Sequence, residues 1–373
     1  MGSMRRCATI GLALLLGCST GGADDDGETE SGSSGGAQTS GVAESSAGPT
    51  SDGATSMSGD TMPGGEDSTG AESGGETSAT TGTPGDWEPP FEDVRNYIFG
   101  HSLILHSPTA NVPRWLDAIA DASGYGYSMS GQYGFADTHA TNLPPMAQWG
   151  IEGVDAAWND DDGLAFEDID FNTVLFTEAN FRQYYPPTSP EPDVGLTSSV
   201  DSTLTVFDWV NAAEPGVRFI VYENWPDMAS FTSADFDTVY PSADELAAYH
   251  AFTQGEFHQW WLDYHDALRA LRPDLTIHMV PVGPILASLL TGPLADIPPE
   301  VFYEDDAPHG RESLYFLAGL ATSMAIHGRP DPSFEVPEDV DARIRDRYPE
   351  LVDAIWFELQ SFEDPSGTHR IFD

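Results

Sequence analysis

The sequence predicts an α/β fold in which a parallel sheet is covered by helices on both faces. Strand-like and helix-like segments alternate along the chain from residue 94 onward, and this alternation is typical of a parallel sheet with crossover helices. Two strand-like segments, NTVLF at 172–176 and VRFIVY at 217–222, are almost entirely apolar, as strands buried on both faces are. Every Trp, Tyr and Phe lies between residues 87 and 373, so the core belongs to this region.

Turn and capping residues mark where the elements begin and end. Gly100 closes the first strand and Gly131 the second. Asn111, with a proline two residues later, predicts a helix start, and Ser242 with Glu245 three positions on forms a capping box. The expected strands are 94–99, 127–129, 172–176, 217–222 and 275–282. The expected helices are 113–122, 201–213, 242–271, 311–327 and 340–360.

The first residues form a targeting segment rather than part of the fold. Two arginines precede an apolar run at 8–16 that is too short to span a bilayer. The run ends in Leu-Leu-Gly-Cys at 15–18, which resembles the bacterial lipobox. The resemblance implies that residues 1–17 are a lipoprotein signal peptide cleaved before Cys18, which then receives lipid. An ordinary signal peptide with a chance cysteine is the alternative.

Residues 18–86 are expected to be the lipidated cysteine followed by a disordered linker. Positions 19–86 contain 13 acidic residues, no aromatic residue and no arginine, so the segment cannot bury enough apolar surface to offset its ordering entropy. A Gly/Ser-rich coil of this length spans roughly 45 Å. It would tether one domain at 87–373 to the bacterial cell envelope, with the outer membrane or cell surface as the expected location.

The strong acidity of the chain excludes one class of partner. Asp and Glu total 61 against 14 Lys plus Arg, which gives a formal net charge of −47. A groove for nucleic acid needs clustered positive charge, so no nucleic-acid partner is expected. The same acidity favours neutral over anionic substrates. No run of about 20 apolar residues occurs, so the lipid at Cys18 is the expected membrane anchor.

Residues that can carry chemistry follow the predicted strands. Ser102 comes after the first strand, Gly131 after the second and Asn180 after the third, while Asp306 and His309 precede the helix at 311–327. Ligands of parallel sheets bind beyond the carboxyl ends of the strands, where these residues can converge. Ser102, His309 and Asp306 fit the nucleophile, base and orienting acid of a serine hydrolase. The N–H groups of Ser102 and Gly131 and the Asn180 amide fit an oxyanion hole.

The order of these residues resembles the SGNH/GDSL hydrolase superfamily. Ser102 in FGHSL matches the nucleophile of that family. Gly131 matches its oxyanion glycine, and Asn180 in TEANF matches its oxyanion asparagine. Asp306 and His309 in EDDAPHG match its acid and base. The resemblance covers most of the folded domain and implies a three-layer α/β/α, flavodoxin-like fold with about five parallel strands. It also implies serine esterase activity without a cofactor or a metal.

The chain departs from the family pattern in two motifs. His101 stands where the family places an Asp before the nucleophile. Glu178 and Phe181 stand where the third motif has a Gly and an Asp. The Asp is not the triad acid, so its loss removes no catalytic role. A side chain in place of the glycine could reshape the oxyanion loop, which leaves open whether the site is active.

The carboxylate that orients His309 has competitors. Glu304 and Asp305 directly precede Asp306, and the Asp-x-x-His spacing of the family favours Asp306. Asp306 could instead cap the helix that follows, and Ser102 could be an ordinary turn residue.

Aromatic and basic residues near the same edge are candidates for binding substrate. Trp225, with Tyr184 and Tyr185, could offer a flat surface to a sugar ring or an acyl group, and Arg182 could bind a polar group there. Ordinary loop packing explains the same residues equally well.

Two further patterns resemble metal sites but fit them poorly. His250, His258 and His265 are eight and seven residues apart on one expected helix, whereas zinc-binding helices use spacings of three or four. The Asn-Asp-Asp-Asp-Gly run at 159–163 would place Trp158 at the first ligand position of a calcium loop, so a solvated acidic turn is favoured.

The sequence thus predicts a surface-tethered serine esterase that hydrolyses a neutral ester, with deacetylation of a glycan as the favoured reaction. Two alternatives remain. The same triad would serve an O-acyltransferase, in which a sugar hydroxyl replaces water. A catalytically silent scaffold could serve as a surface binding lipoprotein.

Overall fold

The computed structural model describes residues 91–159, 161, 163–191, 197–236, 238–330 and 333–372. All of them belong to the unit Thr77–Asp373. The expected signal peptide at 1–17, the lipidation site Cys18 and the linker to residue 86 lie outside the described residues. So do the boundary expected at 87 and two aspartates of the acidic turn, Asp160 and Asp162.

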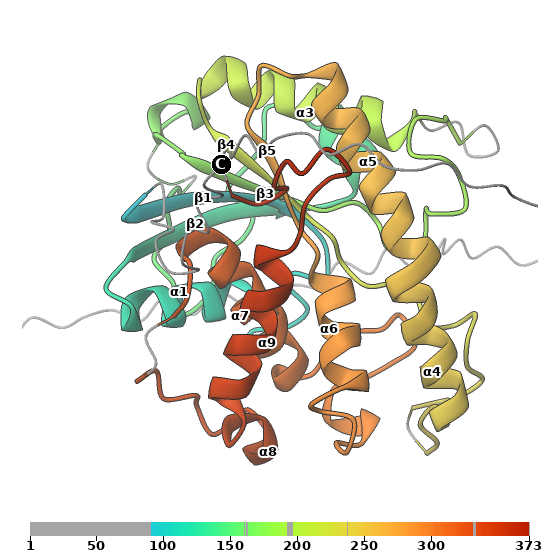
Figure 1. Cartoon of the computed structure of the whole chain (residues 1–373). Helices are drawn as coiled ribbons and strands as arrows, with labels where there is room; N and C mark the ends of the chain where they lie inside the picture. Colours follow the sequence, from blue (N-terminus) through green and yellow to red (C-terminus); the bar gives the residue numbers. More distant parts are fainter. Residues whose placement is uncertain are drawn as a thin grey trace, which may run out of the picture. The chain divides into compact units, whose positions relative to one another are not determined.

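A five-stranded, all-parallel sheet lies at the centre of this unit (Figure 1). Its strands are β1 Asp93–Gly100, β2 Gly126–Tyr133, β3 Thr173–Phe176, β4 Arg218–Tyr222 and β5 Ile277–Val280. They lie in the order β2-β1-β3-β4-β5, which is the flavodoxin-like order. The expected α/β fold with about five parallel strands is confirmed. The second strand is longer than expected, because it continues through Gly131 to Tyr133.

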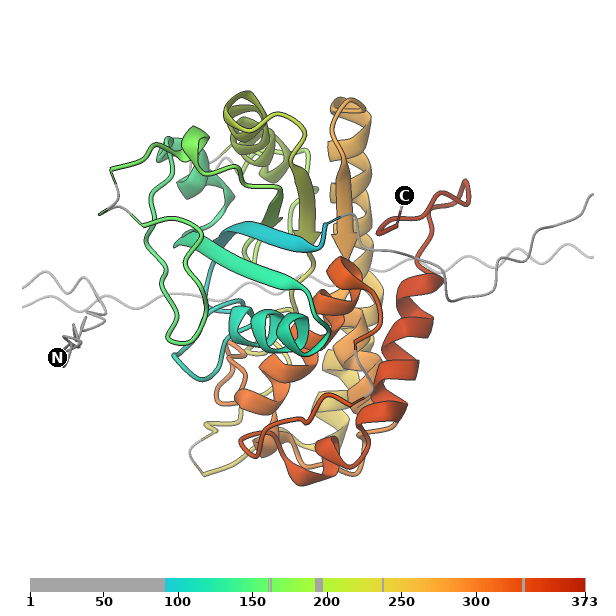
Figure 2. The same ribbon diagram turned by 90° about the vertical axis from the view of Figure 1, so that its left-hand side faces the viewer.

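Helices pack on both faces of the sheet (Figures 1 and 2). They are α1 Pro113–Ala122, α2 Ala136–Thr141, α3 Ser199–Ala213, α4 Ala243–Phe252, α5 His258–Leu271, α6 Val282–Thr291, α7 Glu312–His327, α8 Ala342–Arg345 and α9 Tyr348–Gln360. The helix expected at 242–271 is divided by a π-helical segment, Thr253–Phe257, in which Gly255 leaves the helical region. Helices α2 and α6 were not expected. The strand expected at 275–282 is correspondingly shorter, because Val282 already begins α6.

Alternate residues of each strand enter two separate apolar cores. Ile98 and Leu175 face the side covered by α1, α6, α7 and α9. Phe99 and Phe176 face the opposite side, where α3 and α5 pack. Both faces are apolar, so the strands read as continuous apolar runs rather than as alternating ones. This explains why the strands could be recognised from the sequence.

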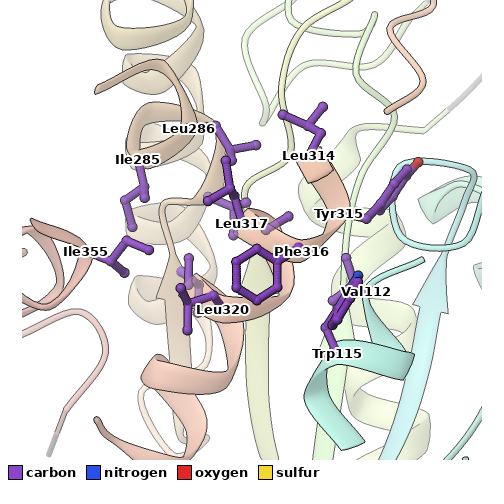
Figure 3. Packing of buried hydrophobic residues seen from close by; sticks show 14 of the residues in the cluster. Val112, Trp115, Ile285, Leu286, Leu314, Tyr315, Phe316, Leu317, Leu320 and Ile355 are labelled. Atoms are coloured by element: carbon purple, nitrogen blue, oxygen red, sulfur yellow. The ribbon is translucent and has the colours of Figure 1, made fainter. Parts of the chain in front are cut away.

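Helix α7 is the centre of the first core, and its residues from Ser313 to His327 are all buried. Figure 3 shows its side chains between those of α6 and α9 on one side and Trp115 of α1 on the other. A Cβ at Gly319 would lie 2.5 Å from the Cβ of Trp115. Glycine therefore allows α1 to pack closely against α7, and α7 begins directly after the segment that carries His309.

Two kinds of feature are absent from the described residues. No described helix combines the length and apolarity that crossing a membrane requires. The described part of the chain also holds no group of three or more His, Cys, Asp or Glu side chains able to hold a metal ion.

Candidate active site

The turn after β1 presents Ser102 at the carboxyl edge of the sheet. The His101 carbonyl accepts hydrogen bonds from the N–H groups of Ile104 (2.9 Å) and Leu105 (3.1 Å), which closes a tight turn around Ser102. The Tyr315 hydroxyl donates to the Ser102 carbonyl at 2.5 Å. Tyr315 is buried in the core on α7, with its hydroxyl directed away from the apolar cluster (Figure 3). This turn, residues 101–105, is called the nucleophile turn below. It is therefore held both by its own backbone hydrogen bonds and by a side chain from the core.

His101, which stands where the SGNH/GDSL pattern has an Asp, ties this turn to the end of β3. Its Nε2–H donates to the Glu178 carbonyl at 3.1 Å, and its Nδ1 lies 3.4 Å from the Leu103 N–H. Asn224 after β4 donates to the same Glu178 carbonyl at 2.6 Å. Burial lowers the pKa of His101 to about 4, although the hydrogen bond to Glu178 opposes this. At neutral pH, His101 is thus an uncharged structural link between strand ends.

Ser102 and His309 meet at hydrogen-bond distance although 207 positions separate them. Ser102 Oγ lies 2.8 Å from His309 Nε2. The His309 Nδ1 lies 2.6 Å from Asp305 Oδ2. The hydroxyl, the imidazole and the carboxylate therefore lie in one continuous line, which is an arrangement able to activate a serine hydroxyl. The pair Ser102 and His309 expected from the sequence is brought together.

The acid expected from the sequence, Asp306, is wrong, because Asp305 contacts the imidazole. Asp305 Oδ1 accepts the backbone N–H groups of Ala307 (3.0 Å) and His309 (2.8 Å), and this leaves Oδ2 aimed at the ring. Asp306 is exposed, and its carbonyl accepts from Met228 N at 2.9 Å. Burial alone would raise the pKa of Asp305, but the hydrogen bonds from His309 and Ala307 outweigh it and hold the pKa below its ordinary value. Asp305 therefore stays ionised.

The segment that carries the acid and base follows α6 and the short 3₁₀ helix Pro299–Val301, not β5 directly. Neutral hydrogen bonds from two other strand ends hold it in place. The Trp225 Nε1–H donates to the Pro308 carbonyl at 2.9 Å, and the Asn180 amide donates to the Ala307 carbonyl at 3.2 Å. Trp225 is only 2% exposed, so the expectation that it contacts substrate is wrong. The N–H of its indole is instead bound to the Pro308 carbonyl of this segment.

The expected oxyanion hole is only partly assembled. Among the described residues, none accepts a hydrogen bond from the Ser102 N–H, and Asn180 has a second amide hydrogen beyond the one given to Ala307. Gly131 does not fit this role, because it lies inside β2 opposite Ile98, before the strand ends. A Cβ there would lie 2.5 Å from the Ile98 carbonyl, so glycine is required by sheet packing. Gly134 after β2 donates its N–H to Gly100 O (2.8 Å) instead.

Arg182 is also not available to a substrate, contrary to the sequence expectation. Its side chain is 4% exposed and pairs with Glu178 (3.5 Å), Asp137 (3.1 Å) and Glu191 (2.8 Å). Burial raises the pKa of Glu178, and the Arg182 charge opposes that rise. The Glu178 side chain also accepts the Ala179 N–H at 2.7 Å. Glu178, which stands where the SGNH/GDSL pattern has a glycine, thus forms a buried ion pair with Arg182.

Aromatic side chains are exposed along the same edge of the sheet. Tyr184 is 76% exposed, and Phe181, directly after Asn180, is 48% exposed. Phe181 packs edge-on against Phe135 with ring centroids 5.3 Å apart, and Phe135 lies 5.3 Å from the His101 ring. Phe181 and Phe135 thus connect the exposed surface to the His101 ring of the nucleophile turn.

The three histidines near the long helix have structural partners or are buried. His258 Nδ1 lies 2.9 Å from both carboxylate oxygens of Glu223, whose pKa burial raises to about 7 against the influence of His258. The His265 ring contacts the Ile277 carbonyl (3.1 Å) and Arg370 (2.8 Å). His250 is buried. These contacts give His258 and His265 structural roles.

Sequence reasoning missed three residues of the site. Asp305 is a competitor of Asp306 in the sequence, and only its hydrogen bonds from the backbone N–H groups of Ala307 and His309 select it. Tyr315 reads as one more apolar residue of α7. His106 stacks on His309 with ring centroids 4.1 Å apart, and nothing in its sequence surroundings marks it.

Comparison with known proteins adds a distant structural likeness. No family model matches the chain, and no curated protein matches it. The chain is similar to a solved protein from Parabacteroides merdae ATCC 43184 that is provisionally named a GDSL-like lipase. The match has a TM-score of 0.36 and 10% identity, and it covers 64% of this chain and 97% of that one. The assignment of the site therefore depends on its own geometry.

Proposed function

We propose that this protein is a serine esterase that cleaves neutral esters through Ser102, His309 and Asp305. The observation that carries the proposal is the line of contacts from Asp305 through His309 to Ser102, with distances of 2.6 and 2.8 Å. These groups sit where the carboxyl ends of parallel strands meet, which is the usual ligand position in such sheets. The likeness to the SGNH/GDSL superfamily in motif order supports the same reaction.

The first half-reaction transfers the acyl group to the enzyme. Ser102 Oγ attacks the ester carbonyl carbon while its proton passes to His309 Nε2, and the carbonyl electron pair moves onto oxygen. The Ser102 N–H and the Asn180 amide are the donors available to that oxyanion. When the oxyanion collapses, the bond to the alcohol oxygen breaks, and the alcohol leaves with the proton from His309.

The second half-reaction releases the acid. Water gives a proton to His309 and attacks the acyl carbon, and the Ser102 oxygen leaves with that proton. Asp305 remains ionised throughout and holds the Nδ1–H of His309, which keeps the base in one orientation. An acceptor hydroxyl in place of water would make the reaction an acyl transfer.

For the substrate, we propose an acetylated glycan. The exposed rings of Tyr184 and Phe181 offer surfaces on which a sugar can stack, and the net charge of −47 favours a neutral ligand over an anionic one. Incubation with an acetylated polysaccharide, followed by measurement of free acetate, tests this. Transfer of acetyl groups to an added acceptor glycan would identify an acyltransferase instead.

We also propose that Cys18 is lipidated and holds the enzyme at the bacterial cell envelope. The arginine pair, the apolar run at 8–16 and the Leu-Leu-Gly-Cys sequence support it. Metabolic labelling with a palmitate analogue should mark the native protein but not the Cys18→Ala variant. Equal labelling of both would reject the anchor.

The decisive experiment is replacement of the nucleophile. Ser102→Ala should lower hydrolysis of p-nitrophenyl acetate by at least about 10³-fold while the protein stays folded. Ser361→Ala, at the end of α9, serves as the matched control and should keep full activity. A fluorophosphonate probe should label Ser102 in the native protein, as located by peptide mapping. Unchanged turnover in Ser102→Ala, or no labelling, would favour a silent binding scaffold.

A further inference from the structure

We propose that His106 is a positioning residue that acts through His309. Its imidazole covers one face of the base, fixes the plane of that ring and stabilises the imidazolium that forms during the reaction. The inference rests on the proposed function. It starts from the geometry of two rings, since His106 and His309 are stacked with centroids 4.1 Å apart and planes 13° from parallel.

The backbone of His106 is held independently of the base that its ring covers. Its N–H donates to the Ala110 carbonyl at 3.1 Å, and Leu105 pairs with Asn111 in an antiparallel bridge, so the segment folds back on itself. The Asn111 amide closes the segment further through the Ser107 and Pro108 carbonyls. On its outer edge, His106 Nε2 lies 3.3 Å from Glu304 Oε2. The backbone of His106 is therefore held by its own segment, and the Nε2 edge of its ring is held by Glu304.

The stacking supplies a restraint that the triad contacts do not. Ser102 and Asp305 bind the two nitrogens of His309, and both contacts act along the edge of the ring. Such contacts define the direction of the nitrogens but allow the plane to rock around the line that joins them. A second planar ring against one face opposes that rocking. It keeps Nε2 directed at Ser102 Oγ while the proton moves between them.

The stacking also has an electrostatic consequence. During the reaction, His309 carries a positive charge, and a neutral aromatic ring over a cation stabilises it. The groups that face the stacked pair are Glu304 and Asp305 from the segment before α7 and His101 from the turn after β1. Burial and the nearby His309 lower the pKa of His106, against the opposing carboxylate of Glu304. His106 is therefore uncharged at neutral pH.

Three variants separate stacking from simple support of the fold. His106→Phe keeps a planar ring, His106→Leu fills similar space without one, and His106→Ala removes both. We expect kcat to fall about 10-fold in His106→Ala and His106→Leu with little change in KM. His106→Phe should stay within about 3-fold of the native enzyme. Thermal unfolding of all three identifies any variant that is not folded.

The pH profile gives a readout that a structural role would not move. A neutral ring over His309 stabilises the imidazolium that forms during the reaction, so removing the ring should change the pH dependence of the rate. The acid limb of kcat/KM should move to lower pH by about 0.5 unit in His106→Ala and stay in place in His106→Phe. An unshifted limb in His106→Ala, or equal kcat values in the Phe and Leu variants, would overturn the proposal.

The failure of this inference differs from a failure of the proposed esterase activity. If native Ser102 is labelled by fluorophosphonate and His106→Ala is labelled at the same rate, the esterase stands and the positioning role falls. If native Ser102 is not labelled, both fall. We expect labelling of His106→Ala to be about 10-fold slower than labelling of the native protein.

Discussion

The two segments that carry the site at the carboxyl edge of the sheet are held in opposite ways. The segment after β3, which contains Asn180, is held by charge. Glu178 is completely buried, and its partner Arg182 is 4% exposed and also pairs with Asp137 and Glu191. Removing such a charge from water is costly, so every member of the group depends on the others.

The segment Glu304–Gly310, which contains the base, is held by neutral groups. Trp225, Met228 and Asn180 all make hydrogen bonds to its backbone carbonyls. Of its three carboxylates, the one on Asp305 is half-buried and bound to His309. No buried cation competes for that carboxylate among its described contacts.

The comparison shows that structural and reactive charges are kept apart. Arg182 pairs with the carboxylates that hold the segment after β3. None of these groups contacts Ser102 or His309 in the described structure. Asp305 is left to interact with the base alone. The buried charges around Arg182 and the contacts of Asp305 can therefore be removed separately, although Asn180 joins the two segments through its hydrogen bond to the Ala307 carbonyl.

The largest effect should come from the reactive charge. Asp305→Asn keeps the shape of the side chain but removes the charge that stabilises the His309 imidazolium. We expect kcat for p-nitrophenyl acetate to fall by about 10³- to 10⁴-fold. The neighbouring Asp306→Asn is a matched control and should stay within about 2-fold. Equal losses in the two variants would contradict the assignment of Asp305.

A loss of stability should follow when the structural charge is removed. Arg182→Met leaves Glu178 buried without a partner, so the free energy of unfolding should fall by about 3–5 kcal/mol in denaturant titrations. Adding Glu178→Gln should restore part of it. Arg329→Gln breaks an exposed pair with Asp353 and should cost less than about 1 kcal/mol. Equal losses in Arg182→Met and Arg329→Gln would show that the buried group does not hold the segment.

The smallest effect should come from one neutral hydrogen bond. Trp225→Phe removes the N–H that binds the Pro308 carbonyl, which is worth about 1 kcal/mol, and should lower kcat about 3- to 10-fold. Trp158→Phe removes a similar bond to Leu164 and should lower stability without changing kcat. A loss of activity in Trp158→Phe equal to that in Trp225→Phe would mean that the effect is not local.

Most of the fold could be predicted because its signals are local. Apolar runs such as 217–222 and the capping box at Ser242 need only neighbouring residues to be read. The π-helical segment at Gly255 and the extension of β2 through Gly131 depend on tertiary packing, so the sequence pattern did not show them. The pair Ser102 and His309 was found because motif order carries across the chain.

Four other residues, Gly131, Arg182, Trp225 and Asp306, were misassigned because their roles depend on direction rather than on position. Trp225 and Arg182 both lie near the site, but their polar groups point inward to Pro308 and to buried carboxylates. Asp305 and Asp306 differ by one position, and only the turn formed by the backbone N–H groups of Ala307 and His309 decides between them. Such turns follow from coordinates, not from composition.

The hydroxyl of Tyr315 on the Ser102 carbonyl joins the nucleophile to the most deeply enclosed helix of the domain. Because its carbonyl is bound to a side chain of this helix, Ser102 is not expected to move independently of α7. On heating, activity should therefore be lost in the same transition in which the core unfolds, rather than at a lower temperature at which the domain is still folded.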